Sequence, residues 1–398
     1  MSGWVEVSLG SIIEVIGGGT PKTSNPEYWN GEIPWLSVVD FNTGLKFVSD
    51  TEKKITNLGL VESSTKILNS GDIIISARGT VGAMARLAKP MSFNQSCYGI
   101  RNISNISDIE YTFYLLKDCV SELKQITHGG VFDTITRETF NEIFISLPPL
   151  PEQKAIANVL SSLDDKIDLL HRQNKTLEAM AETLFRQWFI EEAKEDWGVI
   201  PFEDFFDFLE GPGIRNWQYT NTGTPFINIR LINEGDIDIS KASFISDEEA
   251  NVKYNHFKLK EGDMIVSTSG TLGKNAIVRS YHLPLVLNTS VIRFRPKDGK
   301  SFSFTYQYLN SKLFVEQLET QASGSVQANF GPTHLKKLTM VNPPDEVLNK
   351  ICNYTDCYYA RIKNNSAQIQ TLEKLRDNLL PKLMSGEVRV AYDQHDAA

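Results

Sequence analysis

Two long stretches of the chain place hydrophobic residues at alternating steps of four and three positions, which is the spacing of a coiled-coil seam. The first runs from Ile156 to Trp188, and the second, from Ile351 to Leu383, keeps the same phase 195 positions later. Each stretch follows a proline pair and an acidic residue, which together signal the start of a helix. The pattern therefore predicts two long helices that pair with each other.

The predicted seam places an asparagine in each helix. Asn174 and Asn365 would fix the register of the helix pair at some cost in stability. The seam residues that we assign to helix pairing and to docking of other subunits are Leu160, Leu163, Ile167, Leu170, Asn174, Leu177, Leu184, Trp188, Ile362, Asn365, Ile369, Leu372 and Leu379.

Outside these helices the apolar residues form short β-branched and aromatic runs between glycine turns, which is typical of an α/β module. One such run, GDIIISARGTVG at 71–82, recurs as GDMIVSTSGTLG at 262–273. Further matches follow in the same order, including IPWLS at 33–37 with TPFIN at 224–228. The chain therefore contains an internal repeat, two copies of a unit of nearly 200 residues.

The repeat predicts an α/β (α+β) fold with two globular modules in tandem, each followed by a long helix. Two copies related by a pseudo-twofold axis would pair their helices antiparallel as a coiled coil. The expected boundaries are a first module at 1–148, a helical region at 149–195, a second module at 196–343, a helical region at 344–386 and a tail at 387–398.

Composition narrows the class of protein. The 398 residues carry a formal net charge of −9, but the two copies of the glycine motif open segments that are locally basic. An acidic chain can meet a polyanion through such faces. The chain has no apolar run of the roughly 20 residues that a membrane helix needs, no signal-peptide pattern and no CxxC pair. We expect a cytoplasmic protein with reduced thiols and no membrane contact.

Several segments resemble one known family. LPPLPEQKAIANVLSSLDDKID, LEAMAETLFRQWF and the terminal LEKLRDNLLPKLMSGEVRV resemble the helical regions of the specificity subunit of type I restriction-modification systems. GGGTPKTSNPEYWNGEIPWLS and GDIIISARGTVG resemble segments of the target recognition domains of that family. The resemblance covers the chain in order, although the second copy has no LPEQ after Pro344 and has EGPGI in place of IGGGTPK.

The resemblance implies a division of labour. Each module would read one half of a bipartite, asymmetric site in double-stranded DNA, and the helices would set the spacer and dock two modification subunits. Those partners would bind S-adenosylmethionine and methylate adenine. A restriction subunit would add an endonuclease that uses ATP and Mg²⁺. No cofactor is expected on this chain.

The residues themselves offer no catalytic set. Six histidines are scattered singly, without the spacing of metal ligands. The string Asn342-Pro343-Pro344 looks like a methyltransferase motif, but the aromatic residue that would follow is absent and its repeat partner is Leu147-Pro148-Pro149. The loop at 17–22 lacks the GK[ST] ending of a phosphate-binding loop. We therefore assign no catalytic residue and no metal ligand.

Comparing the two copies indicates where DNA contacts would lie. The glycines, Asp and Ser of the motif agree between copies, which favours a role as scaffold, whereas Arg78 is replaced by Ser269 and Ala83 by Lys274. Arginine suits a bidentate contact to guanine. The predicted DNA contacts are Thr20, Lys22, Arg78, Thr80, Arg86, Arg215, Asn216, Ser269, Thr271 and Lys274.

Two alternatives remain open at this stage. The same protein could serve an orphan methyltransferase that has no nuclease. A protein of another class, a bivalent scaffold whose two modules grip proteins, would show the same repeat, although the locally basic motifs disfavour it.

Overall fold

The computed structural model describes residues 3–103, 105–128, 134–233, 235–268, 273–297, 301–322 and 330–391. The chain divides into two units by its contacts. Unit 1 comprises Met1–Arg172 and Ser366–Ala398, and unit 2 comprises Gln173–Asn365. The helical regions therefore do not form units of their own, because each long helix is shared between the two.

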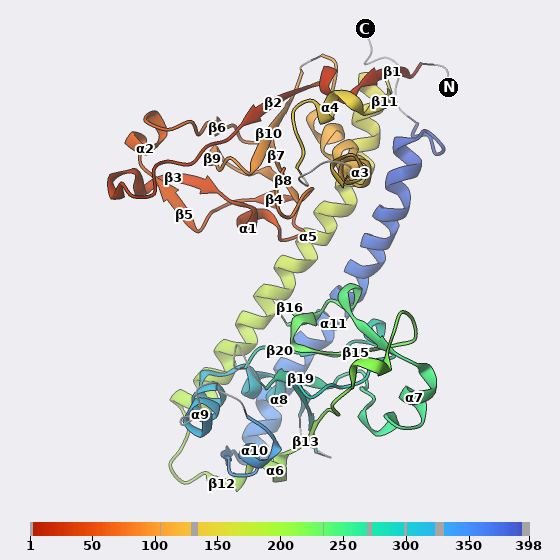
Figure 1. Cartoon of the computed structure of the whole chain (residues 1–398). Helices are drawn as coiled ribbons and strands as arrows, with labels where there is room; N and C mark the ends of the chain where they lie inside the picture. Colours follow the sequence, from red (N-terminus) through yellow and green to blue (C-terminus); the bar gives the residue numbers. More distant parts are fainter. Residues whose placement is uncertain are drawn as a thin grey trace. The chain divides into compact units, whose positions relative to one another are not determined.

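Unit 1 is built on two larger sheets (Figure 1). The first has the order β2 (Ile13–Gly17), β10 (Cys97–Asn102), β7 (Ile73–Ser76), β8 (Met84–Leu87) and β4 (Phe47–Val48). The second has the order β5 (Lys53–Ile55), β3 (Trp29–Leu36), β9 (Met91–Phe93) and β6 (Ile67–Leu68). The strands β1 (Val5–Ser8) and β11 (Phe144–Leu147) pair separately.

The isoleucine run of the glycine motif is strand β7, and its burial explains its composition. Successive side chains of a strand point to opposite faces of the sheet. Ile73 and Ile75 enter one hydrophobic cluster and Ile74 enters another, and all three are fully buried. A strand covered on both faces needs apolar residues at every position.

Helices complete unit 1. The short ones are α1 (Val38–Phe41), α2 (Asn57–Val61) and α4 (Thr139–Glu142), and the long ones are α3 (Ile109–His128) and α5 (Leu150–Arg186). One cluster joins Tyr114 of α3, Leu160 of α5 and Leu383 near the end of α11 (Asp345–Met384). The helix pair thus forms part of the core of unit 1.

Unit 2 repeats this organisation with smaller sheets. Its strands are ordered β13 (Phe206–Glu210), β21 (Val291–Pro296), β19 (Met264–Ser267) and β20 (Asn275–Ile277) in one sheet, and β14 (Tyr219–Thr220), β18 (Ser243–Ile245) and β15 (Thr224–Phe226) in another. The remaining pairs are β12 (Gly198–Pro201) with β22 (Thr339–Asn342), and β16 (Ile232–Asn233) with β17 (Asp236–Ile237). The helices are α6 (Phe202–Phe205), α7 (Asp247–Asn251), α8 (Phe302–Asn310), α9 (Lys312–Ala322) and α10 (Pro332–Leu335).

The pairing of α5 with α11 is antiparallel within each unit, as predicted. In unit 1 Arg376 of α11 donates to Asp164 of α5 at 2.7 Å. In unit 2 the two seam asparagines meet, and Asn365 Nδ2 donates to Asn174 Oδ1 at 2.8 Å. A second contact inside unit 1, between Leu170 and Ile369, shows that residue numbers fall along α11 as they rise along α5. Seam residues such as Leu170 and Ile369 are buried in one hydrophobic cluster.

The segment expected to be a tail begins as a packed part of unit 1. Val390 packs on the main hydrophobic cluster of that unit, and Arg389 pairs with Glu152 in the first turn of α5. The described start of the expected tail therefore contacts the rest of unit 1. Residues 392–398 lie outside the described part of the chain.

Candidate nucleic-acid interface

Three loops of unit 1 leave the same edge of its first sheet. Strands β2 and β7 both run antiparallel to the strand between them, β10. Tyr98, near the start of β10, lies opposite Gly17 at the end of β2 and Ile75 near the end of β7. The loops after Gly17 and Ser76, and the loop before Cys97, therefore meet at this edge, which we call the loop edge.

Backbone hydrogen bonds tie the loop edge of unit 1 together. The Ala77 N–H donates to the Ser96 carbonyl at 2.8 Å, and the Ala77 carbonyl accepts from the Ile135 N–H at 3.0 Å. The Gly19 N–H donates to the Phe93 carbonyl at 3.0 Å. Loops that are fixed in this way can hold exposed side chains in place.

The same frame is built in unit 2. The Thr268 N–H donates to the Ser290 carbonyl at 3.0 Å, and the Thr268 carbonyl accepts from the Phe330 N–H at 3.1 Å. These bonds join the residues that correspond to Ala77, Ser96 and Ile135 in the repeat. The repeat thus specifies a loop geometry as well as a sequence of strands.

Ser76 and two glycines shape the motif loop itself. The Ser76 hydroxyl accepts from the Ala83 N–H at 2.8 Å and also contacts the Thr80 carbonyl. Gly79 and Gly82 have φ of 75° and 85°, a left-handed conformation that glycine adopts without strain. These contacts support the scaffold role expected for the residues that agree between the copies.

The aspartate of the motif is a second part of the scaffold. The Asp72 carboxylate accepts from the Asn69 N–H at 2.8 Å and from Arg101, at 3.1 Å and 2.6 Å. In unit 2 Asp263 accepts from the Lys260 N–H at 2.7 Å and pairs with Arg295 in the same two-pronged way. Arginines that made these segments look basic are therefore partly used inside each unit.

Arg86 is the predicted DNA contact that the structure places inside the fold. Only 8% of the residue is exposed. Its guanidinium pairs with Glu110 of α3, donates to the Gly71 carbonyl at 3.2 Å and lies 5.4 Å from the ring of Phe47. Burial lowers the pKa of Arg86, opposed by nearby carboxylates. Because its partners are internal, this placement argues against Arg86 as a DNA contact.

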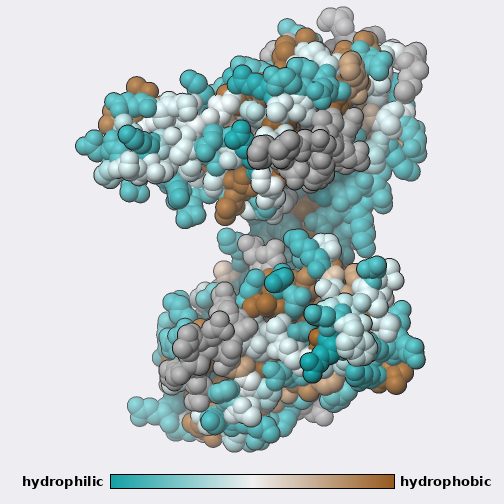
Figure 2. Space-filling view, in the orientation of Figure 1, coloured by the Kyte–Doolittle hydropathy of each residue, from teal (hydrophilic) through white to brown (hydrophobic). Residues whose placement is uncertain are grey.

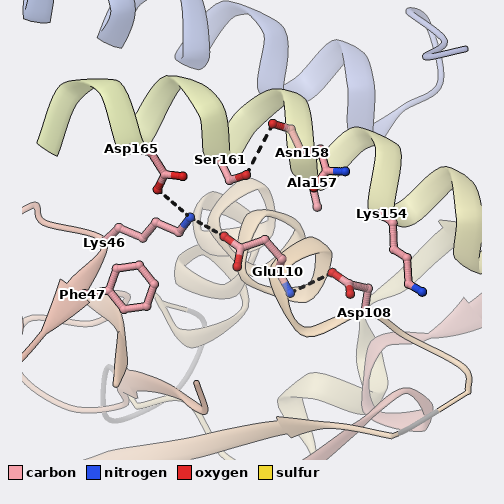
Figure 3. Close-up of a pocket in the computed structure, with 9 residues that line it drawn as sticks. All are labelled: Lys46, Phe47, Asp108, Glu110, Lys154, Ala157, Asn158, Ser161 and Asp165. Atoms are coloured by element: carbon pink, nitrogen blue, oxygen red, sulfur yellow. Dashed lines mark hydrogen bonds and ion pairs between the residues drawn. The ribbon is translucent and has the colours of Figure 1, made fainter. Parts of the chain in front are cut away.

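Beside Arg86, unit 1 has a polar pocket of about 320 Å³ against α5 (Figure 3). Lys46 extends across it toward Glu110 and Asp165, and its Nζ lies 3.6 Å from the Asp165 carboxylate. Burial lowers the pKa of Lys46, partly offset by Asp165. The charged groups Lys46, Glu110 and Asp165 that line the pocket already pair with one another. They form a structural network that links the module to α5.

The other predicted contacts fall on or near the loop edges, with different exposure. Lys22, Arg78, Thr80, Arg215 and Asn216 are exposed. Thr20 is half-buried beside Gln95, and Lys274 is half-buried after the unit 2 motif loop. Ser269 and Thr271 lie outside the described residues.

Two exposed arginines at the loop edges were missed by the sequence reasoning. Nη2 of Arg137 lies 3.2 Å from the place where Gly17 would carry a Cβ atom. Arg230 sits in a turn whose preceding N–H, that of Ile229, donates to the Ser290 hydroxyl at 3.2 Å. Both arginines lie far in sequence from the glycine motif, from the loop at 17–22 and from their repeat counterparts, where the contacts were expected.

The exposed surface is mainly polar. Figure 2 shows small, separate hydrophobic patches on the visible face of each unit. Scattered apolar residues of this kind are normal on a protein surface. Among the described residues, no helix is long and apolar enough to cross a membrane, and no group of three His, Cys, Asp or Glu could hold a metal ion.

The buried cysteines are not placed for chemistry. Cys97, Cys119 and Cys352 are buried, and burial raises the pKa of Cys97 to about 12. A thiol must lose its proton to act as a nucleophile. These residues therefore pack the core.

Comparison with known proteins agrees with this architecture. The family model described as "Type I restriction modification DNA specificity domain" matches residues 1–179 and 194–374. The chain is 30% identical to the type I restriction enzyme MjaIX specificity subunit of Methanocaldococcus jannaschii, over 97% of this chain and 94% of the relative. It is 26% identical to the MjaVIII specificity subunit of the same organism, over 97% and 93%.

A solved structure shares the fold. The S subunit of a type I restriction-modification system from M. genitalium aligns with a TM-score of 0.54 at 14% identity, over 96% of each chain. The family model matches one segment in each copy of the repeat, and the MjaIX relative is matched along nearly its full length. The chain belongs to the family of type I restriction-modification DNA specificity subunits.

Proposed function

We propose that this specificity subunit reads a bipartite, asymmetric DNA site, one half at the loop edge of each unit. The observation that carries the proposal is that one hydrogen-bonded loop frame is built twice, with different side chains displayed on it. Arg78 is exposed in unit 1, and the frame residues around it, such as Ala77 and Ser76, have the same bonds or the same identity in unit 2. Two equal frames with unequal side chains suit two unlike half-sites.

The chemistry of the loop edge supports this division. An exposed guanidinium on a fixed loop can make a bidentate contact to guanine, whereas hydroxyl and lysine groups make more adaptable contacts to bases or phosphates. Lys22, Arg137 and Arg78 would serve the unit 1 half-site, and Arg215, Arg230 and Lys274 the unit 2 half-site. Phosphate contacts by such groups would make binding weaken with added salt.

The chain itself would supply no catalysis. Two modification subunits would dock on the helical region, bind S-adenosylmethionine and methylate adenine, and a restriction subunit would add an endonuclease that uses ATP and Mg²⁺. Buried seam residues such as Leu160 and Ile362 are already used in helix pairing, so partner subunits would contact outward-facing helix positions. Leu169, Met180 and Leu375 are exposed examples.

The direct test is to purify the chain with its modification subunits, treat unmethylated genomic DNA and map the methylated adenines. We expect methylation at one bipartite sequence with a fixed unread gap. The variant Arg78→Ala should relax or abolish recognition of one half-site and leave the other unchanged.

Lys89→Ala is the matched control, because Lys89 is an exposed cation of unit 1 that follows β8 at the opposite edge of the same sheet. It should leave the methylated sequence unchanged. Methylation at any sequence by the wild-type complex would contradict the proposal and favour a protein scaffold. DNA cleavage in the presence of a restriction subunit would separate a full restriction system from an orphan methyltransferase.

A further inference from the structure

Trp217 of unit 2 is unusual because a large aromatic side chain is displayed to solvent. It is 77% exposed, more than any other aromatic residue in the described part of the chain. Its neighbours along the chain, Arg215 and Asn216, are exposed as well. Tryptophan is normally buried for most of its surface. Packing within unit 2 therefore does not explain this residue.

The turn that carries Trp217 is anchored to the rest of unit 2 by its neighbouring residues. Trp217 is the central residue of a short 3-10 turn, Asn216–Gln218. Gln218 is 3% exposed, and its amide donates to the Tyr254 hydroxyl at 2.9 Å and to Glu249 at 2.7 Å. The ring of Tyr219 stacks on Phe226 with centroids 5.4 Å apart. A side chain presented by a fixed turn loses less freedom on binding than one on a loose loop.

The turn continues from the loop edge of unit 2. The loop that leaves β13 passes so close to Asn288 that a Cβ on Gly211 would lie 2.5 Å from its backbone. Gly213 would come within 3.9 Å of Thr289. The chain thus runs along the Asn288–Ser290 turn of the loop edge before it reaches Trp217. Along the chain an exposed cation, Arg215, stands between Gly213 and Trp217.

The equivalent turn of unit 1 shows that the aromatic residue is no part of the scaffold. There the 3-10 turn Pro26–Tyr28 is anchored by the Tyr28 hydroxyl, which donates to Glu62 at 2.5 Å. The exposed central residue is Glu27 in place of Trp217. A carboxylate at this position would be repelled by phosphates. Both turns are therefore anchored through their last residue, while the displayed central residue differs.

We propose that Trp217 is a DNA-deforming residue, whose indole inserts at a base step within or beside the half-site read by unit 2. This inference rests on the proposed function. Apolar and aromatic wedges unstack a base step and bend the duplex, and they recognise a sequence through the cost of deforming it. Arg215 would hold the adjacent phosphate while the indole enters the stack. Unit 1, with Glu27, would read its half-site without such a wedge.

The test uses the full chain in complex with its modification subunits, and DNA that carries the site mapped with the wild-type complex. The fluorescent base 2-aminopurine is placed in turn at each position of both half-sites. Apart from the adenines that the modification subunits would extrude for methylation, we expect a large change in fluorescence at one step on the unit 2 side with wild type. The change should persist with Trp217→Phe and disappear with Trp217→Ala, and affinity for the site should fall on the order of 10-fold with Trp217→Ala.

Phe144→Ala is the matched control, since Phe144 is a 66% exposed aromatic on β11 of unit 1. It should bind and distort the site as wild type does. The proposal is overturned if Trp217→Ala keeps the fluorescence change, or if it weakens binding only by losing the modification subunits. A wild-type complex without site-specific methylation would instead refute the proposed function, so the two failures are distinguishable.

Discussion

The two units pack against the helix pair through different kinds of interaction. Unit 1 uses ion pairs: Asp164 of α5 is 6% exposed by side chain and accepts from Arg376 of α11 and from the Tyr114 hydroxyl, each at 2.7 Å. At the repeat-equivalent positions unit 2 has Tyr359 and Ala181, both buried in its aromatic cluster. The same fold therefore accepts either a buried ion pair or apolar packing at equivalent positions.

The contrast extends beyond this pair. The Glu152 carboxylate of unit 1 is fully buried and accepts from Trp4 at 3.0 Å and from Arg389 at 2.6 Å and 2.9 Å. Its repeat equivalent is the half-buried Val347. Arg86, opposite Ile73, corresponds to Ile277, opposite Met264. The repeat preserves backbone pairing and leaves side-chain chemistry free to diverge, because a core position needs either apolar contacts or a satisfied charge.

Phe304→Ala should give the largest loss of stability and should act on unit 2. Phe304 is 4% exposed, and its ring lies 4.8 Å from that of Phe189 and 5.2 Å from that of Phe205. Removing it leaves a cavity in a packed core, which costs about 3–5 kcal/mol. Hydrogen exchange should accelerate among the amides of unit 2. Equal acceleration throughout unit 1 would contradict separate cores.

Arg376→Ala should cost about 3 kcal/mol and act on unit 1. It leaves the Asp164 carboxylate buried with only the Tyr114 hydroxyl as partner, and an unpaired buried charge is strongly destabilising. The double variant that combines Asp164→Asn with Arg376→Leu should recover much of the lost stability. The uncharged amide that replaces the carboxylate can still accept a hydrogen bond from Tyr114. Free energies of unfolding from denaturant titration measure both. A double variant weaker than the single one would contradict this account.

Replacing one seam asparagine should have a smaller effect, of about 1–2 kcal/mol. Asn365→Leu leaves the Asn174 amide without the partner that it has at 2.8 Å. Replacing both with leucine should restore or raise stability while loosening the register of the helix pair. Disulfide cross-linking between cysteines placed in register and one turn out of register would detect the loosening. Cross-linking only in register would show that the asparagines do not set it.

The smallest effect concerns pH. Burial raises the pKa of Glu178 in unit 2, opposed by the charge of Arg279. The folded state then holds the proton more tightly than the unfolded state, so stability is fully present below the ordinary glutamate pKa and falls as pH rises through the folded pKa. Glu178→Gln should therefore stabilise the protein at neutral pH, with no gain under acid conditions. Exposed Glu182→Gln on the same helix is the control.

Much of the architecture followed from periodicity and repetition. The seam from Ile156 onward predicted helix α5, and its continuation in phase predicted α11, because long heptad patterns have few other solutions. The glycines and Ser76 of the motif were identified as scaffold by agreement between the copies. The pairing of Arg389 with Glu152 gave no signal in the sequence, because it links residues far apart along the chain.

The candidate site was harder to predict. Arg78 and Arg86 look alike in sequence, yet Arg78 is exposed on the loop edge and Arg86 is paired with Glu110 in the interior. Arg137 lies far from the glycine motif in sequence, and nothing local to Trp217 indicates that its side chain is exposed. Local sequence determines charge and shape, but exposure depends on which distant residues fold against the side chain.

By itself the sequence determined the repeat, the helix seam with its asparagine pair and the loop frame, since these depend on local periodicity and on agreement between two copies. Only the tertiary structure decided which lysine and arginine side chains remain free to contact DNA. Asp72 and Arg101 are separated by 29 positions, and the strand pairing of β7 with β10 brings them together. A charge is neutralised by whatever the fold places beside it, so the surface that can meet DNA is set by packing.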